Sequence, residues 1–212
     1  MPALFITFEG LDKAGKSTQI KLLEQRLRDS GRQVLCTREP GGTALGEDIR
    51  SLVMKNRQEA ISDETELLLF AASRAQLLRE TIWPALERGT VVLCDRFADS
   101  TVAYQGYARG MDLDFLRRLN SFALQDRWPD LTFLLDLTVE ESFRRLGRVL
   151  KETAAESDRF EIQGQSFHEK VRQGFLDAAQ ENPARIRRID ATLPLQEIAD
   201  RIWDAVQERL PR

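Results

Sequence analysis

The sequence predicts an α/β fold in which helices flank a five-stranded parallel sheet on both faces. Five short apolar runs have the length and β-branched content of buried strands, and stretches of helical periodicity separate them. Strands that alternate with helices are typical of a parallel sheet covered on both faces. A glycine-rich loop between the first apolar run and the first helical stretch also favours this fold.

The predicted strands cover residues 4–8, 34–37, 91–94, 131–137 and 185–189, and arginines interrupt only the last of them. The predicted helices cover residues 19–28, 65–87, 139–150, 165–180 and 195–210, where apolar side chains recur at helical spacing. Gly89 follows the longest of these stretches and is expected to end it. Residues 151–158 are small and polar, so we expect a mobile loop there.

Composition and charge exclude several classes of protein. The chain has 212 residues, which suits a single domain, and its net charge of −3 argues against a surface that coats nucleic acid. No apolar run reaches the roughly 18 residues of a membrane span, and the first residues lack the basic region of a secretion signal. We therefore expect a cytoplasmic protein that binds neither nucleic acid nor membrane.

The cysteines and the single histidine favour structural roles. Cys36 and Cys94 lie in apolar runs, so we expect two buried thiols, which suit a reducing cytoplasm. Because His168 is the only histidine, a zinc site would lack ligands. We expect His168 to have a surface or capping role.

Residues 10–17, GLDKAGKS, match the phosphate-binding pattern G-x-x-x-x-G-K-[ST]. A strand precedes the loop and a helix follows it, so backbone N–H groups and the positive end of the helix can hold phosphates. We expect Lys16 to reach the outer phosphates of ATP and Ser17 to offer its hydroxyl to Mg²⁺. The predicted ATP-binding residues are Gly10, Leu11, Asp12, Lys13, Ala14, Gly15, Lys16, Ser17 and Thr18.

Three classes of protein compete for such a loop: small-molecule kinases, GTPase switches, and motor or transporter ATPases. The chain has no N-K-x-D motif, with which a GTPase reads its base, and it is short for a large ATPase. The run VVLCD ends an apolar strand in Asp95, which resembles a Walker B element and would place this carboxylate near the magnesium. The alternative is an acid that caps the strand end.

Three further segments would meet the loop at the carboxyl ends of the strands, where open α/β sheets bind ligands. They are residues 37–43, residues 70–74 and residues 95–106. Phe70 and Arg74 are four residues apart on a helix, so an aromatic ring and a guanidinium share one face and can bind a base together. The alternative for Phe70 is a core position.

These motifs in combination resemble the thymidylate kinase family over essentially the whole chain. The matching pieces are FEGLDKAGKST, TREPGGT, LLLFAASR, VVLCDRF, AYQGYARG, PDLTFLLDL and SDRFE. The resemblance implies the three-layer P-loop fold of nucleoside monophosphate kinases, as one domain over residues 1–212 with a small lid at about 148–160. It implies transfer of the γ-phosphoryl group of ATP to dTMP, which gives ADP and dTDP in dTTP biosynthesis. Family members are homodimers that pack long helices face to face.

The resemblance also implies a role for each matching residue of the acceptor site. Arg38, Arg50 and Arg96 resemble the clamp on the dTMP phosphate, and Phe70 resembles the ring that stacks on thymine. Arg74 and Gln105, with Ser100 nearby, resemble the groups that read the thymine edge. Tyr104 resembles the residue that crowds the sugar 2′ position, and Asp12 resembles the carboxylate near the 3′-hydroxyl and the metal.

The lid departs from the family pattern, because residues 151–158 are more acidic than basic and Lys13 follows Asp12. We hypothesise that Lys13 supplies the positive charge on the transferring phosphoryl group that a lid arginine supplies elsewhere. The alternative is a solvated Lys13, with Arg159 or Arg148 in that role. The predicted catalytic residues are Lys16, Arg96, Asp12, Lys13 and Arg159.

Two other functions stay open at this point. The acceptor could be another nucleotide, such as dUMP or a deoxynucleoside, because the thymine methyl group is worth only about 1–3 kcal/mol in an apolar pocket. The chain could also be a nucleotide-binding regulator that has lost the transfer activity. The intact Lys16, Ser17, Asp95 and Arg96 argue against this second alternative.

Overall fold

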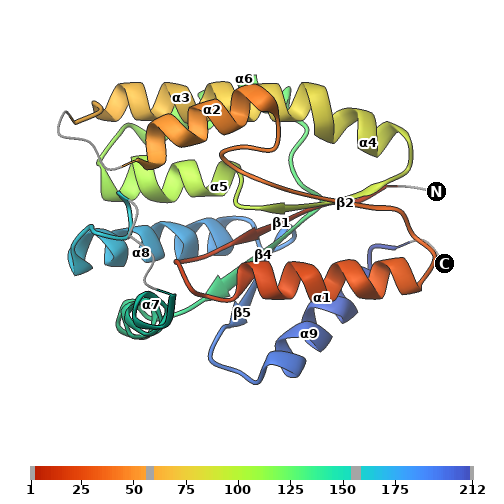
Figure 1. Ribbon diagram of the computed structural model, residues 1–212. Helices are drawn as coiled ribbons and strands as arrows, with labels where there is room; N and C mark the ends of the chain where they lie inside the picture. The colour runs from red at the N-terminus through yellow and green to blue at the C-terminus, as the bar shows by residue number, and fades with distance from the viewer. Residues whose placement is uncertain (1–2, 56–59, 154–158, 211–212) are drawn as a thin grey trace.

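A computed structural model describes residues 3–55, 60–153 and 159–210, with the side chains of 150–153 left out. Its five strands are all parallel and pair in the order β2-β3-β1-β4-β5 (Figure 1). They are β1 (Phe5–Glu9), β2 (Val34–Arg38), β3 (Val91–Asp95), β4 (Leu131–Asp136) and β5 (Ile186–Asp190). The predicted five-stranded parallel sheet is confirmed, and each strand lies within one residue of its predicted position.

Helices cover both faces of the sheet, and Figure 1 shows them as layers above and below it. They are α1 (Lys16–Asp29), α2 (Ala44–Met54), α3 (Asp63–Leu77), η1 (Leu78–Ile82), α4 (Trp83–Glu87), α5 (Ala98–Thr101), η2 (Val102–Ala108), α6 (Leu113–Leu124), α7 (Val139–Thr153), α8 (Gln165–Glu181) and α9 (Leu195–Gln207). The elements η1 and η2 are stretches of π-helix that continue α3 and α5.

Alternate residues of β1 and β3 pack into two different hydrophobic clusters, one on each face of the sheet. Ile6 and Phe8 of β1 pack with Leu23 and Ile202 on the face that α1 and α9 cover. Phe5 packs on the opposite face, with the residues of η1, α4 and α6. This burial on both faces explains why the strands appear in the sequence as continuous apolar runs.

The predicted helices are all present, and three further helical segments appear. The predicted helix over 65–87 is continuous through α3, η1 and α4, and Gly89 follows it with a φ of 80°. The sequence analysis did not identify α2, α6, or the segment formed by α5 and η2. The helix α7 continues through Thr153, so the predicted loop over 151–158 is wrong for its first three residues, and 154–158 lie outside the described residues.

Two predictions about single residues are wrong. Cys36 is exposed, because β2 lies at the edge of the sheet and its successive residues alternate between covered and open sides; Cys94 of β3 is buried as predicted. His168 is buried in α8 rather than at the surface, with the edges of Phe143 and Phe167 packed against its ring. Among the described helices, none combines the length and apolar composition needed to cross a bilayer.

Candidate active site

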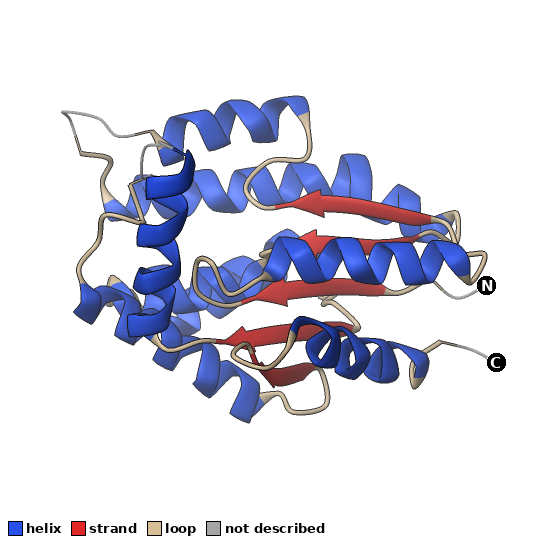
Figure 2. Ribbon diagram, turned by 60° about the horizontal axis from the view of Figure 1, so that its bottom comes forward, coloured by secondary structure: helices blue, strands red, loops and turns tan. Residues whose placement is uncertain are grey.

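The carboxyl ends of the strands lie at one edge of the sheet, as the parallel arrowheads of Figure 2 show. The loop after β1, the turn after β2 and the segment after β3 leave the sheet at this edge. Together with α3 and α7 they line a cavity of about 830 Å³. The cavity is therefore at the position where parallel α/β sheets bind ligands.

The phosphate loop wraps the N-terminus of α1. Gly10 has a φ of 131°, and a Cβ at this position would lie 2.4 Å from the carbonyl oxygen of Leu135, so only glycine fits. Lys16 is buried and its Nζ donates to the carbonyl oxygens of Gly10 and Leu11, at 3.2 and 2.9 Å. Burial, followed by the nearby charge of Arg96, lowers the pKa of Lys16 to about 8.

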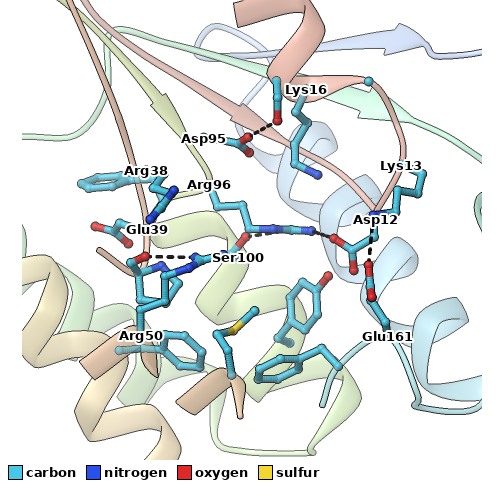
Figure 3. Close-up of a pocket in the computed structure, with 18 of the residues that line it drawn as sticks. Asp12, Lys13, Lys16, Arg38, Glu39, Arg50, Asp95, Arg96, Ser100 and Glu161 are labelled. Atoms are coloured by element: carbon cyan, nitrogen blue, oxygen red, sulfur yellow. Dashed lines mark hydrogen bonds and ion pairs between the residues drawn. The ribbon is translucent and has the colours of Figure 1, made fainter. Parts of the chain in front are cut away.

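A hydroxyl and a carboxylate meet at the start of α1. The Oγ of Ser17 donates to Oδ2 of Asp95 at 2.8 Å, and Figure 3 shows Asp95 near Lys16. Both side chains offer oxygen ligands, and Mg²⁺ in phosphoryl-transfer sites is held by one or two such groups together with substrate phosphates. The residues present therefore fit a magnesium ion next to the phosphate loop.

Arg96 crosses the centre of the cavity. Its NH2 lies 2.6 Å from Oδ1 of Asp12 (Figure 3), and its NH1 donates to the carbonyl oxygen of Gly10 at 3.0 Å. Its guanidinium also lies 5.3 Å from the ring centroid of Tyr104. Burial opposes ionisation of Asp12, but Arg96 and Lys16 outweigh it and lower its pKa to about 2. The phosphate loop and the segment after β3 thus meet through an ion pair.

Lys13 extends from the phosphate loop to the segment that follows the predicted lid. Its Nζ lies 3.1 Å from Oε1 of Glu161 (Figure 3). The helix α7 also contacts the loop, because Ser142 donates to the carbonyl oxygen of Asp12 and Arg145 donates to that of Lys13. The segments on both sides of the predicted lid therefore contact the phosphate loop.

The basic residues on the other side of the cavity come from β2 and α2. Arg38 is exposed and its NH2 donates to Oε2 of Glu47 at 2.8 Å. Arg50 donates to the carbonyl oxygen of Pro40 at 3.1 Å. Figure 3 shows Arg38 and Arg50 on the side of the cavity opposite Asp12 and Lys13. The cavity thus carries positive charge at two separated places.

Aromatic side chains line the cavity between these charged regions, among them Phe70, Tyr104 and Phe160. Phe70 of α3 lies 6.0 Å from Phe160, centroid to centroid, and Phe160 lies 5.8 Å from Tyr104 of η2. Phe70 is half-buried, so part of its surface stays open to the cavity. An aromatic wall of this kind can bind the face of a base.

Arg74 and Gln105 lie deeper in the cavity wall. Arg74 is 2% exposed, and its guanidinium donates to Glu39, Asn120, Thr101 and the carbonyl oxygen of Phe97. Burial raises the pKa of Glu39 to about 7, against the attraction of Arg74.

The structure brings almost all predicted site residues to the cavity wall, but not Arg159. The lining includes Asp12, Lys13, Gly15, Lys16, Ser17, Thr18, Arg38, Arg50, Phe70, Arg74, Asp95, Arg96, Ser100, Tyr104 and Gln105. Gly10, Leu11 and Ala14 belong to the same loop without lining the cavity. The guanidinium of Arg159 instead binds Glu66 and the carbonyl oxygen of Val53, whereas Arg148 of the alternative interpretation does line the cavity.

The sequence analysis missed five acidic residues at or next to this site: Glu9, Glu39, Glu66, Glu141 and Glu161. Glu9 is buried at the end of β1, where it accepts hydrogen bonds from Phe97 N, Ser100 N and Ser100 Oγ. Burial, followed by repulsion from Asp99, raises its pKa to about 7. A charged residue that ends an apolar strand is the signal that identified Asp95, and it could have identified Glu9 as well.

Comparisons with known proteins agree with this geometry. A family model described as thymidylate kinase matches residues 8–202. The chain is 50% identical over 208 residues to a thymidylate kinase of Thermomicrobium roseum, which covers 98% of this chain and 96% of the relative. It is 48% identical over 206 residues to a thymidylate kinase of Deinococcus radiodurans, with 97% of each chain covered. A crystal structure of thymidylate kinase from Ehrlichia chaffeensis matches with a TM-score of 0.76 and 34% identity, covering 97% of this chain and 99% of that one.

Proposed function

Because this chain belongs to the thymidylate kinase family, we propose that the cavity beside the phosphate loop holds both substrates of this enzyme. The chain transfers the γ-phosphoryl group of ATP to dTMP, which yields ADP and dTDP in dTTP biosynthesis. One observation carries the placement of the substrates: a single cavity is lined by the phosphate loop on one side and by Arg38, Phe70 and Arg74 on the other.

On the donor side, residues 10–18 bind ATP. The backbone N–H groups of the loop and the N-terminus of α1 hold the phosphates, and Lys16 exchanges the carbonyl oxygens of Gly10 and Leu11 for phosphate oxygens. Ser17 and Asp95 would hold Mg²⁺ through their oxygens. When bound, the magnesium ion neutralises charge on the phosphates.

On the acceptor side, arginines bind the phosphate and an aromatic ring binds the base of dTMP. Arg38, Arg50 and Arg96 clamp the phosphate, which each can bind through a planar pair of N–H groups. Phe70 stacks on thymine, while Arg74 and Gln105 read its edge and Ser100 lies nearby. Tyr104 crowds the 2′ position of the sugar and Asp12 approaches its 3′-hydroxyl.

The transfer needs neither a covalent intermediate nor a strong base. The dTMP phosphate is already largely ionised at neutral pH, so its oxygen can attack the γ-phosphorus in line. The work of the enzyme is to bring two anions together and to hold the charge of the transferring group. Lys16 of the phosphate loop and Arg96 of the segment after β3 both line the cavity, which supports this use of charge.

Lys13 supplies a further cation for the transferring phosphoryl group in this proposal. It lines the cavity beside Lys16, whereas Arg159 is bonded to Glu66 and Val53 outside it. Arg148 of α7 also lines the cavity and is the competing source of charge. The lid at about residues 148–160 then closes over the phosphates and excludes water, which would otherwise accept the phosphoryl group.

We also propose that the chain works as a cytoplasmic homodimer, with residues 1–212 as one domain. The helices α2, α3 and α6 are neighbours (Figure 1). They expose large apolar side chains, which an interface between copies would cover. These side chains are Leu45, Leu52, Leu68, Phe115 and Phe122. The free thiols of Cys36 and Cys94 support a reducing compartment.

Acceptor-dependent release of ADP from ATP tests the proposed site. The panel is dTMP, dUMP, UMP, dCMP, dGMP and thymidine, each with and without Mg²⁺. We expect a strong response to dTMP, a weaker one to dUMP and background for the rest, because the 5-methyl group is worth only about 1–3 kcal/mol. Activity with a different acceptor would overturn the assignment of the base-reading residues while leaving the phosphate chemistry intact.

A further inference from the structure

Glu66 of α3 is a fully buried carboxylate that lies behind the base-reading wall. Its exposed fraction is 0%, and it is not among the residues that line the cavity. Its Oε1 accepts from Nε2 of Gln105 at 2.8 Å and from Nε of Arg109 at 3.2 Å. Its Oε2 accepts from NH2 of Arg109 at 2.9 Å and from NH2 of Arg159. One carboxylate therefore joins α3, the C-terminal end of η2 and the end of the predicted lid.

This contact determines which way round the Gln105 amide lies. A carboxylate only accepts hydrogen bonds, so the amide must turn its NH2 group, and not its oxygen, toward Glu66. The reverse orientation would place two acceptor oxygens together in a buried site, which costs the desolvation of both. The amide oxygen of Gln105 is then left for the cavity, and no described residue donates to it.

Arg74 presents the complementary group beside it. Four of its five N–H groups are used by Glu39, Asn120, Thr101 and the carbonyl oxygen of Phe97. One N–H donor remains on a side chain that lines the cavity. The wall thus offers one donor and one acceptor, which match the O4 acceptor and the N3–H donor of thymine.

We propose that Glu66 is a positioning residue that sets the choice between thymine and cytosine. By fixing the Gln105 amide with its oxygen toward the cavity, Glu66 makes the wall repel cytosine, whose edge carries an N4 amino donor and an N3 acceptor. This inference rests on the proposed function, because it takes Arg74 and Gln105 as the residues that read the base.

The charge on residue 66 is essential to this role. A glutamine would keep the shape, but its single oxygen would be drawn to the Oε2 position, where two guanidinium groups donate, rather than to the Oε1 position, where among the described residues only Nε of Arg109 donates at 3.2 Å besides Gln105. Its NH2 group would then face Gln105 at the Oε1 position and turn the Gln105 amide round. The cavity wall would then present the NH2 group of Gln105 in addition to the N–H group of Arg74. This second donor can bind N3 of cytosine, which accepts, but not N3–H of thymine, which donates.

The test compares dTMP with 5-methyl-dCMP, which differs only at the base edge that Arg74 and Gln105 read. In Glu66→Gln, we expect the ratio of kcat/KM for dTMP to that for 5-methyl-dCMP to fall about tenfold or more. The ratio for dTMP over dUMP should stay within about threefold, because the 5-methyl group does not contact the amide pair. If Glu66→Gln only loosened the fold, kcat/KM would fall by a similar factor for dTMP, dUMP and 5-methyl-dCMP. That result would contradict the proposal.

Two further variants separate positioning from structure. Arg109→Gln removes another partner of Glu66 but keeps the contact with Gln105, so the ratio for dTMP over 5-methyl-dCMP should keep its wild-type value. In a Gln105→Met background, Glu66→Gln should change this ratio no further, because the amide through which it acts is gone. A full effect of Glu66→Gln in that background would overturn the proposal.

A measurement on the wild-type protein does not depend on how the variants fold. The side-chain NH2 group of Gln105, assigned by its loss in Gln105→Met, should exchange slowly with solvent in the substrate-free enzyme. Exchange as fast as that of an exposed glutamine would refute the anchoring by Glu66. Failure of the wild-type enzyme to prefer dTMP would instead count against the proposed acceptor site, so the two failures are distinct.

Discussion

Lys13 of the phosphate loop and Glu161, which follows the predicted lid, form an ion pair with 3.1 Å between Nζ and Oε1. The two residues that precede Glu161 are also engaged, because Arg159 binds Glu66 and Phe160 packs on Phe70 and Tyr104. Three consecutive side chains thus connect the end of the lid to the acceptor wall and to the donor loop. Occupancy of either substrate site can affect the lid through these contacts.

Lys13→Gly tests whether Lys13 supplies charge to the transferring phosphoryl group. Lys13 has a φ of 60°, so glycine fits the backbone and the change acts through the lost ammonium group. We expect kcat to fall about 100-fold or more, with a smaller change in the KM for dTMP. Lys21→Ala, which removes an exposed lysine of α1, is the matched control. A kcat within about threefold of wild type would leave the role to Arg148.

Asp95→Asn tests the proposed magnesium site. The substitution keeps the shape and the contact with Ser17 but removes the charge that Mg²⁺ prefers in an oxygen ligand. We expect the Mg²⁺ concentration for half-maximal activity to rise about tenfold or more. A titration of activity with Mg²⁺ at fixed ATP measures this. An unchanged midpoint would mean that Asp95 only caps the strand end.

Glu9 predicts a pH dependence of stability. Its pKa is raised to about 7 in the folded chain, against an ordinary value of 4.5, so the folded state holds a proton that the unfolded state releases between these values. This contribution to stability is complete below pH 4.5 and is lost as pH rises through 7. Between pH 5 and 8 we expect wild type to lose about 2 kcal/mol relative to Glu9→Gln, measured by urea unfolding. If the free energy of unfolding changed with pH by the same amount in wild type and in Glu9→Gln, the prediction for Glu9 would be wrong.

Phe122→Glu tests the proposed homodimer. Phe122 is 82% exposed on α6, the largest exposed fraction among the large apolar side chains described. A charge in the centre of an apolar interface is costly to bury, so we expect the variant to sediment as a monomer where the wild-type chain sediments as a dimer. Glu208→Gln, on the C-terminal side of α9, is a control away from α2, α3 and α6. A monomeric wild-type chain would refute the proposal.

The sequence predicted much of the fold because its signals are local. The five strands are continuous apolar runs, since a parallel sheet covered on both faces buries both sides of each strand. The helices α2 and α6 were missed, although the buried apolar residues of α6, Leu116, Ala123 and Leu124, recur at helical spacing, so the signal for this helix was present in the sequence. Cys36 was misplaced because no local pattern shows that β2 is the edge strand.

The sequence by itself determined the phosphate loop, because its glycines, Lys16 and Ser17 are contiguous and their chemistry depends on local backbone shape. Only the tertiary structure decided how the acidic residues are used: Glu66 meets Gln105 across 39 positions of the chain, and Glu161 meets Lys13. Such pairs depend on how the chain returns to the same edge of the sheet. The free energy of a buried carboxylate depends on the donors brought to it there, which no local pattern specifies.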